Sequence, residues 1–468
     1  MITAVSFIGF LIVFTLIGVA SVKYSKKTTE DYLVAGRNVT PFFTALSAMA
    51  TNNSGFMFIG LIGYTYSIGV SSMWIMVGWI IGDYFAWRII YPKLRHESEQ
   101  SQSLTVPSYL TDTKDKLSPW VMRLSAIIVI LFLGVYTAAQ LNAGSKALYS
   151  LFGWPYETGA IIGAAIVLAY CWSGGIRASI WTDVAQSFVM IGSMLLLMAA
   201  ILIEVGGVGA AISQLTAIDP MLLEVIPKDL KFGFAAFVVS WVAAGVGVTG
   251  QPHIIIRPMA IRSVEDMTQA RRVYFFAYIL FTVLCILTGL GARILLENPN
   301  SFDAELALPL LSIQLLPPVL IGFILAGLFA ATMSTADSQI LSCSSAFTQD
   351  LLPARFSNRY VTAKVGTVLA TLLTLGIALF GSKNVFELVV LSWSVLASSL
   401  GPLVILRSLK RTVPGPLALL MMVVGITMVI LWREIPGYSD SVYETLPGMV
   451  AGFAVYFIAK PFYTLNRK

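Results

Sequence analysis

The chain is poor in charged residues and in the side chains that most often catalyse reactions or bind metals. Only 12% of its 468 residues are charged, whereas soluble domains carry about 25%. It has two histidines and no HExxH sequence, so the usual zinc-hydrolase motif is missing. Its three cysteines are far apart in apolar runs, which indicates neither a disulfide framework nor a cysteine metal site. We therefore expect neither an enzyme nor a resident cofactor.

Long polar loops are also missing. The largest stretches between apolar runs, about 93–119 and 206–231, have room for a short surface helix and not for a soluble domain. No GxxxxGK[ST] phosphate-binding loop occurs, so the sequence indicates no nucleotide-driven motor. Any uphill transport must then draw on an ion gradient or on the membrane potential.

Apolar sequence is abundant. Hydrophobic residues make up 57% of the chain and its mean hydropathy is +0.82. Because about 20 apolar residues cross a bilayer, the apolar runs predict an all-α membrane protein with thirteen spanning segments. These lie at about 4–22, 40–68, 71–92, 120–149, 157–175, 179–205, 232–256, 273–296, 315–345, 361–381, 385–406, 413–432 and 446–465.

The distribution of Lys and Arg predicts the orientation. The first apolar run is not a signal peptide, because its three lysines (Lys23, Lys26 and Lys27) follow the run instead of preceding it. With the N terminus outside, 24 of the 30 Lys and Arg residues fall on inner loops and span ends, as the positive-inside rule requires. The six on the outer side are Lys146, Lys228, Lys231, Arg293, Lys383 and Arg433. We expect a cytoplasmic C terminus and a location in the cell inner membrane.

The stretch 44–63, TALSAMATNNSGFMFIGLIG, is long enough to enter a membrane but is interrupted by five small or polar residues at 51–55. Backbone left unpaired in hydrocarbon costs several kcal/mol unless it is buried in protein or lines a cavity. We interpret the stretch as a discontinuous helix whose free carbonyl and amide groups face a ligand. A polar patch packed against a neighbouring helix is the alternative.

A second interruption lies at 241–258, WVAAGVGVTGQPHIIIRP, which contains Gly245, Gly247, Gly250 and Pro252. A harmless kink is the alternative here, since Gly and Pro are common in membrane helices. The segments within 40–205 and 232–406 would form two five-helix units of opposite orientation, each opened by a broken helix, which is the inverted-repeat plan of many secondary transporters. The predicted parts are 1–35, an extra helix with its cytoplasmic link; 36–206, the first repeat; 207–411, an outer loop and the second repeat; and 412–468, two further helices and a cytoplasmic tail.

The segment 327–346, GLFAATMSTADSQILSCSSA, carries a cluster of hydroxyl and carboxyl groups. Ser334, Thr335 and Ser338 lie on adjoining helical turns, and Asp337 follows Ser334 by three residues on the same face. A hard cation such as Na⁺ binds several oxygens at once, and carbonyls of the interrupted stretch would complete the set. Taken singly, each hydroxyl is equally explained by bonding to its own helix.

Asp183 lies just inside the membrane in WSGGIRASIWTDVAQ. An ionised Asp in hydrocarbon costs about 2.5 to 3.5 kcal/mol and so needs a partner. The sequence leaves two partners open: a cation shared with Ser338 and Asp337, or Arg177 in a salt bridge. Asp83 and Glu387 are weaker cases, for which solvation or an ion pair suffices.

Tyr136 and Gln140 stand one helical turn apart in the segment 120–149. They could line a cavity in which an aromatic wall and an amide hold a polar solute. Packing between helices explains the spacing equally well.

Four motifs together resemble the sodium/solute symporter family, most closely its sodium/proline permease branch. They are DYLVAGRNVTPFFTALSAMATNNSGF, WSGGIRASIWTDVAQ, GQPHIIIRPMA and AATMSTADSQILSCSSAFTQDLL. They occur in the family's order, and the resemblance runs along nearly the whole chain. It implies thirteen helices with a LeuT-type five-plus-five inverted-repeat core, one extra helix before the core and two after it, and sodium-coupled import by alternating access.

The resemblance also implies site residues. A main sodium site would use the carbonyls of Ala50, Asn53 and Ala331 and the hydroxyls of Ser334 and Thr335. A second cation site, present in some relatives, would involve Asp183, Ser334, Asp337 and Ser338. The substrate pocket would be lined by Asn52, Ser54, Gly55, Phe56, Tyr136, Gln140, Gly250, Gln251 and His253.

Three departures from proline permeases bear on the solute. Those permeases carry Asp where this chain has Asn52, so a charge tied to sodium and substrate binding is missing. Ala244 and Val248 replace a Trp and a Tyr, which widens the pocket. Asp337 stands where several relatives have Ser and moves a carboxylate into the second cation region.

We therefore expect sodium-coupled import of a small polar solute, an amino acid such as proline or a related zwitterion or carboxylate. Sodium is the expected coupling ion, and the sequence indicates no nucleic acid and no required protein partner. Proton-coupled symport of a monocarboxylate or sugar is the main alternative, since Asp337 could carry a proton. A transporter-like membrane sensor and a channel are further alternatives.

Overall fold

The structure is a computed structural model that describes residues 1–111, 115–228, 230–296, 301–357 and 359–465. Within these ranges every regular element is a helix, and the β-type pairing is limited to an isolated bridge between Val39 and Ile261. Ten of the described helices are long and apolar enough to cross a membrane. The prediction of an all-α, multi-pass membrane protein is confirmed at this level.

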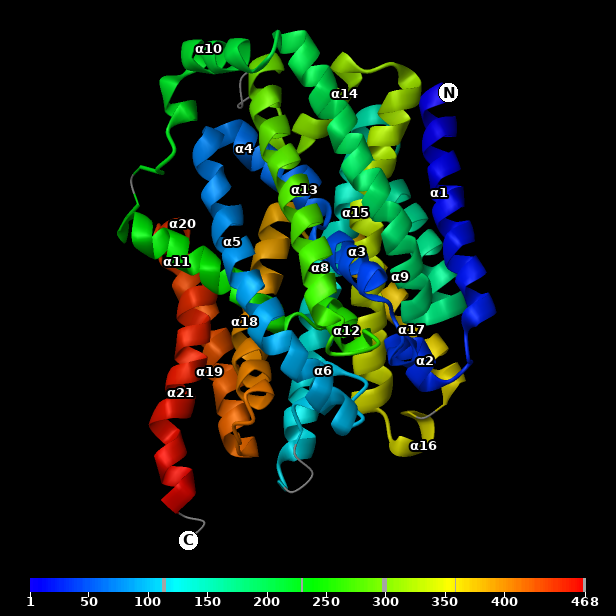
Figure 1. The fold of residues 1–468 in the computed structure, drawn as a ribbon, viewed down its shortest axis with the longest axis vertical. Helices are drawn as coiled ribbons and strands as arrows, with labels where there is room; N and C mark the ends of the chain where they lie inside the picture. The colour runs from blue at the N-terminus through cyan, green and yellow to red at the C-terminus, as the bar shows by residue number, and fades with distance from the viewer. Residues whose placement is uncertain (112–114, 229, 297–300, 358, 466–468) are drawn as a thin grey trace.

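The long helices run between two faces of one bundle (Figure 1). The upper face in this view carries α10 (Val208–Ile218) and α14 (Ala307–Leu315), and the lower face carries α2 (Thr29–Val34), α7 (Val106–Tyr109) and α16 (Ala354–Ser357). The two largest loops thus hold short helices, as expected. The bundle contains α1 (Ile2–Ala20), α5 (Met73–Phe85), α6 (Tyr91–Gln100), α8 (Ser118–Phe152), α9 (Tyr156–Val205), α13 (Met267–Leu295), α15 (Pro318–Ser345), α17 (Tyr360–Phe380), α18 (Val385–Ser408), α19 (Gly415–Glu434) and α21 (Thr445–Leu465).

The 50 residues of α9 form two helices joined at Gly175. A straight helix of that length would measure about 75 Å, more than twice the hydrocarbon thickness of about 30 Å. Gly175 has φ +57°, and a Cβ atom there would lie 2.4 Å from the Tyr32 carbonyl oxygen, so only glycine fits. The two parts of α9 correspond to the predicted segments 157–175 and 179–205.

Two membrane segments are interrupted, and both predicted interruptions are confirmed. α3 (Pro41–Asn52) ends before Asn53, whose φ of −92° and ψ of 69° are not helical, and the chain resumes as η3 (Phe56–Leu61) and α4 (Ile62–Ile68). α11 (Gly233–Val246) leads through the tight turn η7 (Gly247–Gly250) and the extended residue Gln251 into α12 (Pro252–Ala260).

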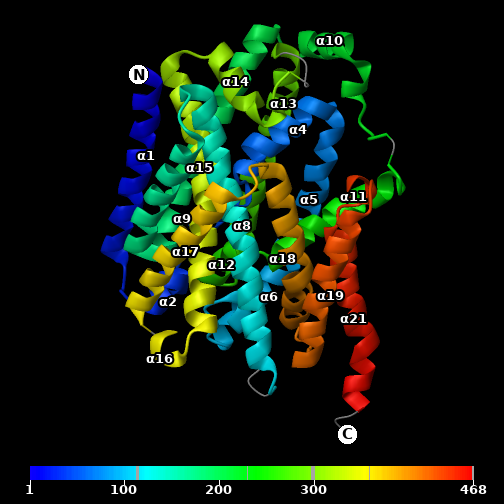
Figure 2. The same cartoon turned by 180° about the vertical axis from the view of Figure 1, so that it is seen from behind.

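The centre of the bundle is α15, which packs against α3, α8, α9, α12 and α17. Every residue from Ile324 to Ser344 is buried. Because this run includes hydroxyls, an amide and a carboxylate, the protein has to satisfy those groups internally. Seen from behind, α1 lies at the edge of the bundle and begins near the upper face, whereas α21 ends near the lower face (Figure 2). Because the polar side chains of α15 are buried at the centre of the bundle, a site would form around them.

Candidate ion and solute site

Hydroxyl groups of α15 meet the last carbonyl groups of α3. Ser334 Oγ lies 3.0 Å from the Ala50 carbonyl oxygen and 3.1 Å from that of Ala331. Thr335 Oγ1 lies 2.9 Å from the Thr51 carbonyl oxygen and 3.1 Å from that of Ala331. All five residues are buried. Each hydroxyl has one proton for two acceptors, so this cluster holds more oxygen lone pairs than protons.

The break after α3 explains why those carbonyls are available. The last carbonyls of a helix have no partner within it, and here the Met49 oxygen accepts from both the N–H and the Nδ2 of Asn53 at 2.9 Å. The next two, of Ala50 and Thr51, accept from α15 instead. The structure thus joins four of the five predicted sodium ligands (Ala50, Ala331, Ser334 and Thr335) and adds Thr51. The Asn53 carbonyl is not among the groups so joined.

Arg257 of α12 lies where the second cation site was predicted. Its Nη2 donates to Asp183 Oδ2 and to Ser179 Oγ, each at 2.9 Å, and also to Ser338 Oγ. Ser47 Oγ accepts from Arg257 Nε at 3.0 Å and donates to Asp183 Oδ2 at 2.6 Å. The guanidinium and the Asp183 carboxylate are both 0% exposed. This is a buried ion pair whose partners are also held by hydroxyl groups.

Arg257 was not among the partners predicted for Asp183. Its salt-bridge alternative, Arg177, is wrong, because Arg177 donates to Asp31 and to the Ala35 carbonyl. The predicted segment 232–256 stopped before Arg257, which was counted among the inner basic residues. α12 continues to Ala260 and buries it. The signal that could have found it is an Arg directly after an interrupted membrane helix.

Asp337 joins the same cluster from α15. Its Oδ1 accepts from Ser338 Oγ at 2.6 Å and from Ser179 Oγ at 2.9 Å, and its Oδ2 accepts from the Tyr170 hydroxyl at 3.0 Å. When both carboxylates are ionised, Asp183 and Asp337 face one guanidinium, and the buried cluster carries one negative charge. A proton or a cation would neutralise it.

The two clusters touch through Thr51. Its Oγ1 lies 3.2 Å from the Ser334 carbonyl oxygen and 3.4 Å from Ser338 Oγ. Ser338 in turn bonds to Arg257 and Asp337. A single side chain, that of Thr51, therefore separates the charged groups around Arg257 from the carbonyls of α3.

Tyr136 and Gln140 of α8 face the two interrupted helices. Gln140 Oε1 accepts from the Gly55 N–H at 2.8 Å, and the ring of Tyr136 stands edge-on to that of His253, with 5.5 Å between centroids. Gln140 Nε2, Gln251 Oε1 and both ring nitrogens of His253 are buried without a hydrogen-bond partner among the described residues. Buried polar atoms are normally paired, so a polar ligand between the breaks would satisfy these groups.

Small residues bring the helices close at both breaks. A Cβ atom on Gly55 would lie 2.7 Å from Thr332 Cγ2 and 3.0 Å from Gln140 Oε1. A Cβ atom on Gly250 would lie 2.5 Å from the Leu396 carbonyl oxygen of α18. Neighbouring helices therefore rest directly on the backbone of the two breaks.

Asn52 points away from the α15 hydroxyls, toward α5 and α13. Its Nδ2 donates to the Tyr274 hydroxyl at 2.6 Å and lies 3.5 Å from Asp83 Oδ2. Tyr274 donates to the same carboxylate oxygen. The sequence placed Asn52 in the pocket but paired it with neither residue, because nothing local links positions 52, 83 and 274.

Aromatic rings cover the break on its upper side. The Phe56 ring lies 5.3 Å from that of Phe386 and 6.3 Å from that of Trp79, and Ser54 Oγ accepts from the Phe56 N–H at 3.2 Å. Glu305, just before α14, bonds to Lys146 of α8 and accepts from the Phe386 N–H at 2.9 Å. The upper side is thus closed by an aromatic layer and an ion pair.

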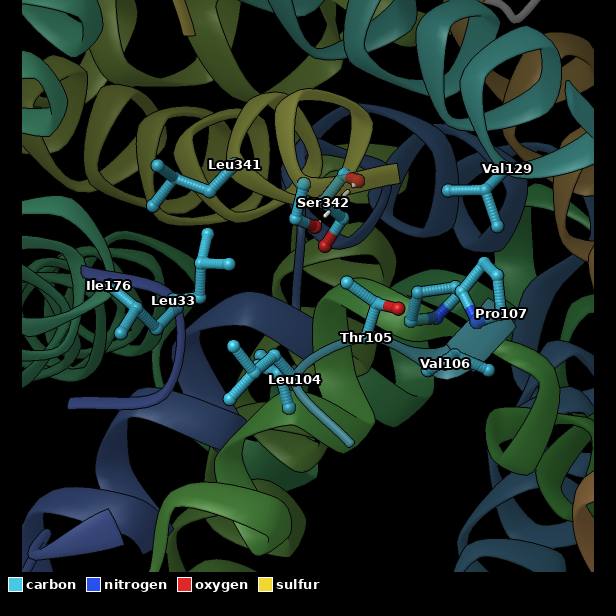
Figure 3. A pocket seen from close by; sticks show the side chains of 12 residues that line it. Leu33, Leu104, Thr105, Val106, Pro107, Val129, Ile176, Leu341 and Ser342 are labelled. Carbon is cyan, nitrogen blue, oxygen red and sulfur yellow. Dashed lines mark hydrogen bonds between the residues drawn. The ribbon is translucent and has the colours of Figure 1, made fainter. Parts of the chain in front are cut away.

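A small pocket, about 20 Å³ in volume, lies beside Ser342 of α15 (Figure 3). Leu33, Leu104, Ile176 and Leu341 line one side, and Thr105 to Pro107 and Val129 line the other, with Ser342 between them. Ser342 Oγ donates to the Ser338 carbonyl at 2.8 Å. The pocket thus begins one turn of α15 below the cluster.

Comparison with known proteins identifies the family and the fold. The model of the sodium:solute symporter family matches residues 32–425. The chain is 32% identical over 460 residues to the high-affinity proline transporter PutP of Bacillus subtilis, covering 95% of each chain. It is 32% identical over 442 residues to the sodium/proline symporter of Escherichia coli, covering 92% of this chain and 87% of that protein.

Solved structures show the same fold. A Na⁺-coupled sialic acid symporter, in a substrate-bound outward-open state, aligns with a TM-score of 0.83 and 19% identity over 99% of this chain and 98% of that chain. MHP1, a nucleobase-cation-symport-1 family transporter in a closed conformation, aligns with a TM-score of 0.57 and 15% identity over 92% of this chain and 95% of that chain. At these identities the likeness concerns the fold alone. Together with the family match, the predicted resemblance is confirmed: the chain belongs to the sodium:solute symporter family.

Proposed function

We propose that this protein imports a small zwitterionic solute, of which proline is the first candidate, together with sodium and by alternating access. The observation that carries the proposal is the contact between the α15 hydroxyls of Ser334 and Thr335 and the carbonyls at the end of α3. The names of the curated relatives, proline transporters and sodium/proline symporters, support the choice of solute.

We infer thirteen membrane crossings with the N terminus outside. The ten long apolar helices, of which α11–α12 is one, support this count. Three crossings are added when α9 is divided at Gly175, when α3–α4 is counted as an interrupted crossing separate from α5–α6, and when α21 is included. The helices from α3 to α9 and from α11 to α18 then form two five-helix units, each opened by a broken helix. The excess of Lys and Arg on the predicted inner side supports the orientation.

Sodium would bind between α3 and α15. The hydroxyls of Ser334 and Thr335 now donate to carbonyls, and each hydroxyl could instead turn its lone pairs toward a cation shared with those carbonyls. Such an ion holds α3 against α15 and so favours the conformation in which they touch. Coupling requires that sodium bind the substrate-competent state more tightly than the other, and each tenfold preference is worth about 1.4 kcal/mol.

The solute would bind between the two breaks. Gln140 Nε2 and His253 are buried donors without partners among the described residues, and they suit the carboxylate of an amino acid. Tyr136 supplies an aromatic wall beside them. The second cation site of Asp183, Ser334, Asp337 and Ser338 stays a proposal, and Arg257 would supply one positive charge there.

The test is uptake of labelled proline into proteoliposomes under an inward sodium gradient. We expect accumulation that disappears when sodium is replaced by potassium at equal ionic strength and membrane potential. Uptake that is indifferent to sodium would remove this mechanism. A screen of amino acids, betaines, monocarboxylates and sugars by thermal shift, in sodium and in potassium, would identify the solute if proline fails, because a ligand of the native state raises its apparent stability.

Proton coupling is a second candidate, favoured by one observation. Asp337 is a buried carboxylate in a cluster that carries one negative charge when both acids are ionised. A proton there would neutralise the cluster as well as a cation would. Sodium-free uptake driven by an inward pH gradient distinguishes the two, and a second cation site predicts none.

A further inference from the structure

We propose that Asp83 binds the positively charged nitrogen of the transported solute, and that Tyr274 and Asn52 position the carboxylate of Asp83. The inference rests on the proposed function and specifies the substrate class: a solute with a cationic nitrogen as well as a carboxylate. Asp83 stands on α5, Tyr274 on α13 and Asn52 at the end of α3. Three elements thus converge on one carboxylate beside the first break.

Asp83 is a buried acid without a positive partner. It is 0% exposed, and none of the ion pairs between described residues includes it. A buried carboxylate has to be neutralised or paired. Asp183, another buried acid of the core, has Arg257 for this purpose. A cationic ligand would supply that charge to Asp83.

The hydrogen bonds around Asp83 leave one oxygen free. Its Oδ2 accepts from Tyr274 and lies 3.5 Å from Asn52 Nδ2, whereas its Oδ1 has no partner among the described residues. The Asn52 amide oxygen is likewise unpartnered. Two acceptors without donors, one of them a carboxylate oxygen, suit an ammonium group, which brings a charge and donors together.

The position also suits a solute that lies between the breaks. Asn52 is half-buried although its neighbours Thr51 and Asn53 are fully buried, so its side chain borders open space. The unpartnered donors Gln140 Nε2 and His253 stand on α8 and α12. Acceptors near Asn52 and donors near Gln140 match the two charges of a zwitterion.

The test compares two competitors of sodium-driven proline uptake in proteoliposomes. Unlabelled proline has the ring nitrogen, and cyclopentanecarboxylate has the same ring and carboxylate without it. In the wild type we expect proline to compete at least tenfold better. In Asp83→Asn we expect the KM for proline to rise about 10- to 100-fold, as for loss of a charged hydrogen bond. The inhibition constant of cyclopentanecarboxylate should change little. Equal competition in the wild type, or preserved discrimination in Asp83→Asn, would overturn the proposal.

A charge swap separates binding from structural support. In the double variant Asn52→Asp with Asp83→Asn the carboxylate moves across the 3.5 Å contact, and we expect most of the discrimination to return. A folded double variant that still cannot discriminate contradicts the proposal. Asp350→Asn is the matched control, because Asp350 is a buried acid that accepts from Thr105 near the lower face, and its removal should leave the competition ratio unchanged.

The sodium readout separates this inference from the proposed function. In Asp83→Asn the sodium concentration for half-maximal uptake should stay within about threefold of the wild type, since Ser334 and Thr335 are untouched. If the wild type shows sodium-driven uptake only of solutes without a cationic nitrogen, sodium coupling stands and the role of Asp83 is wrong. If no solute of the screen shows sodium-driven uptake, the proposed function itself fails.

Discussion

At the scale of single residues, the site consists of groups that already have partners and of groups that have none. Ser334 and Thr335 donate to carbonyls at the end of α3, so both hydroxyls already have acceptors within the protein. Gln140 Nε2, His253 and Asp83 Oδ1 are buried and unpartnered among the described residues. Unpaired buried groups cost about 1 to 3 kcal/mol each. A ligand that pairs them recovers this free energy.

Replacing either hydroxyl should weaken sodium activation. We expect Ser334→Ala and Thr335→Ala each to raise the sodium concentration for half-maximal uptake about tenfold, because each removes one oxygen ligand, worth about 1 to 2 kcal/mol. The measurement is the initial rate of proline uptake against sodium concentration. Ser399→Ala is the control, since that hydroxyl on α18 is buried and bonds only to carbonyls of its own helix. An unchanged sodium dependence in both variants would count against the site.

The sequence predicted the polar groups of the site where they form a local pattern. The interruption at 51–55 and the hydroxyls of 327–346 are visible because a polar run inside an apolar one is a local signal. The pairing of Asp183 with Arg257, 74 positions apart, depends on how α9 and α12 pack, and no local period encodes it. The same holds for Asn52 with Asp83. The polar groups of the site could therefore be predicted from the sequence, but the pairs that they form could not.

At the scale of elements, α5 and α11 approach each other very closely. A Cβ atom on Gly82 would lie 2.1 Å from the Val242 carbonyl oxygen, and one on Gly245 would lie 2.0 Å from that of Trp79. Small residues let membrane helices approach closely. This contact holds the helix of Asp83 against the first half of the second interrupted segment.

Gly82→Ala and Gly245→Ala should therefore both destabilise the protein. A methyl group at either position meets backbone, which cannot rotate away, so the helices must separate, and overpacking of this kind costs about 1 to 3 kcal/mol. The measurement is the apparent melting temperature of the purified protein in detergent, where we expect a clear decrease. Gly376→Ala on α17 is the control, because a Cβ atom there meets nothing within 4 Å. A melting temperature unchanged in both test variants would contradict the close approach.

The extent of the elements was predicted less well than their existence. Charged residues mark the ends of apolar runs, so the segments 71–92 and 232–256 were ended early. In the structure the helices continue to Gln100 and Ala260. These extensions remain helical because buried arginines are satisfied within the protein: Arg95 Nε donates to the Ile261 carbonyl at 2.7 Å, and Arg257 pairs with Asp183. Apolar periodicity does not report a charge that is neutralised by tertiary contacts.

At the scale of the whole molecule, the two faces differ in how they close over the centre. The upper side is covered by the ring layer of Phe56, Phe386 and Trp79 and by the Lys146–Glu305 ion pair. On the lower side lies the pocket of about 20 Å³ beside Ser342, which has room for about one water molecule. With the proposed orientation, import requires a conformation in which the ring layer and the ion pair open toward the outside. The ion pair has to break in that transition.

Glu305→Gln should shift the population toward the outward-open state. Glu305 bonds to Lys146 of α8 and to the N–H of Phe386 at the start of α18, and both charged side chains are only 12% and 13% exposed. Removing the charge costs the closed state about 1 to 2 kcal/mol and should enrich the open state about 5- to 30-fold.

The readout is the rate at which a membrane-impermeant maleimide labels Tyr64→Cys in intact cells. The ring of Tyr64 stacks on that of Phe386, and the three native cysteines are buried. Asp303→Asn is the matched control: Asp303 also bonds to Lys146, at 2.8 Å, but it is 50% exposed and screened by water, so its removal should have little effect. Equal labelling in Glu305→Gln and Asp303→Asn would show that this ion pair does not hold the upper side closed.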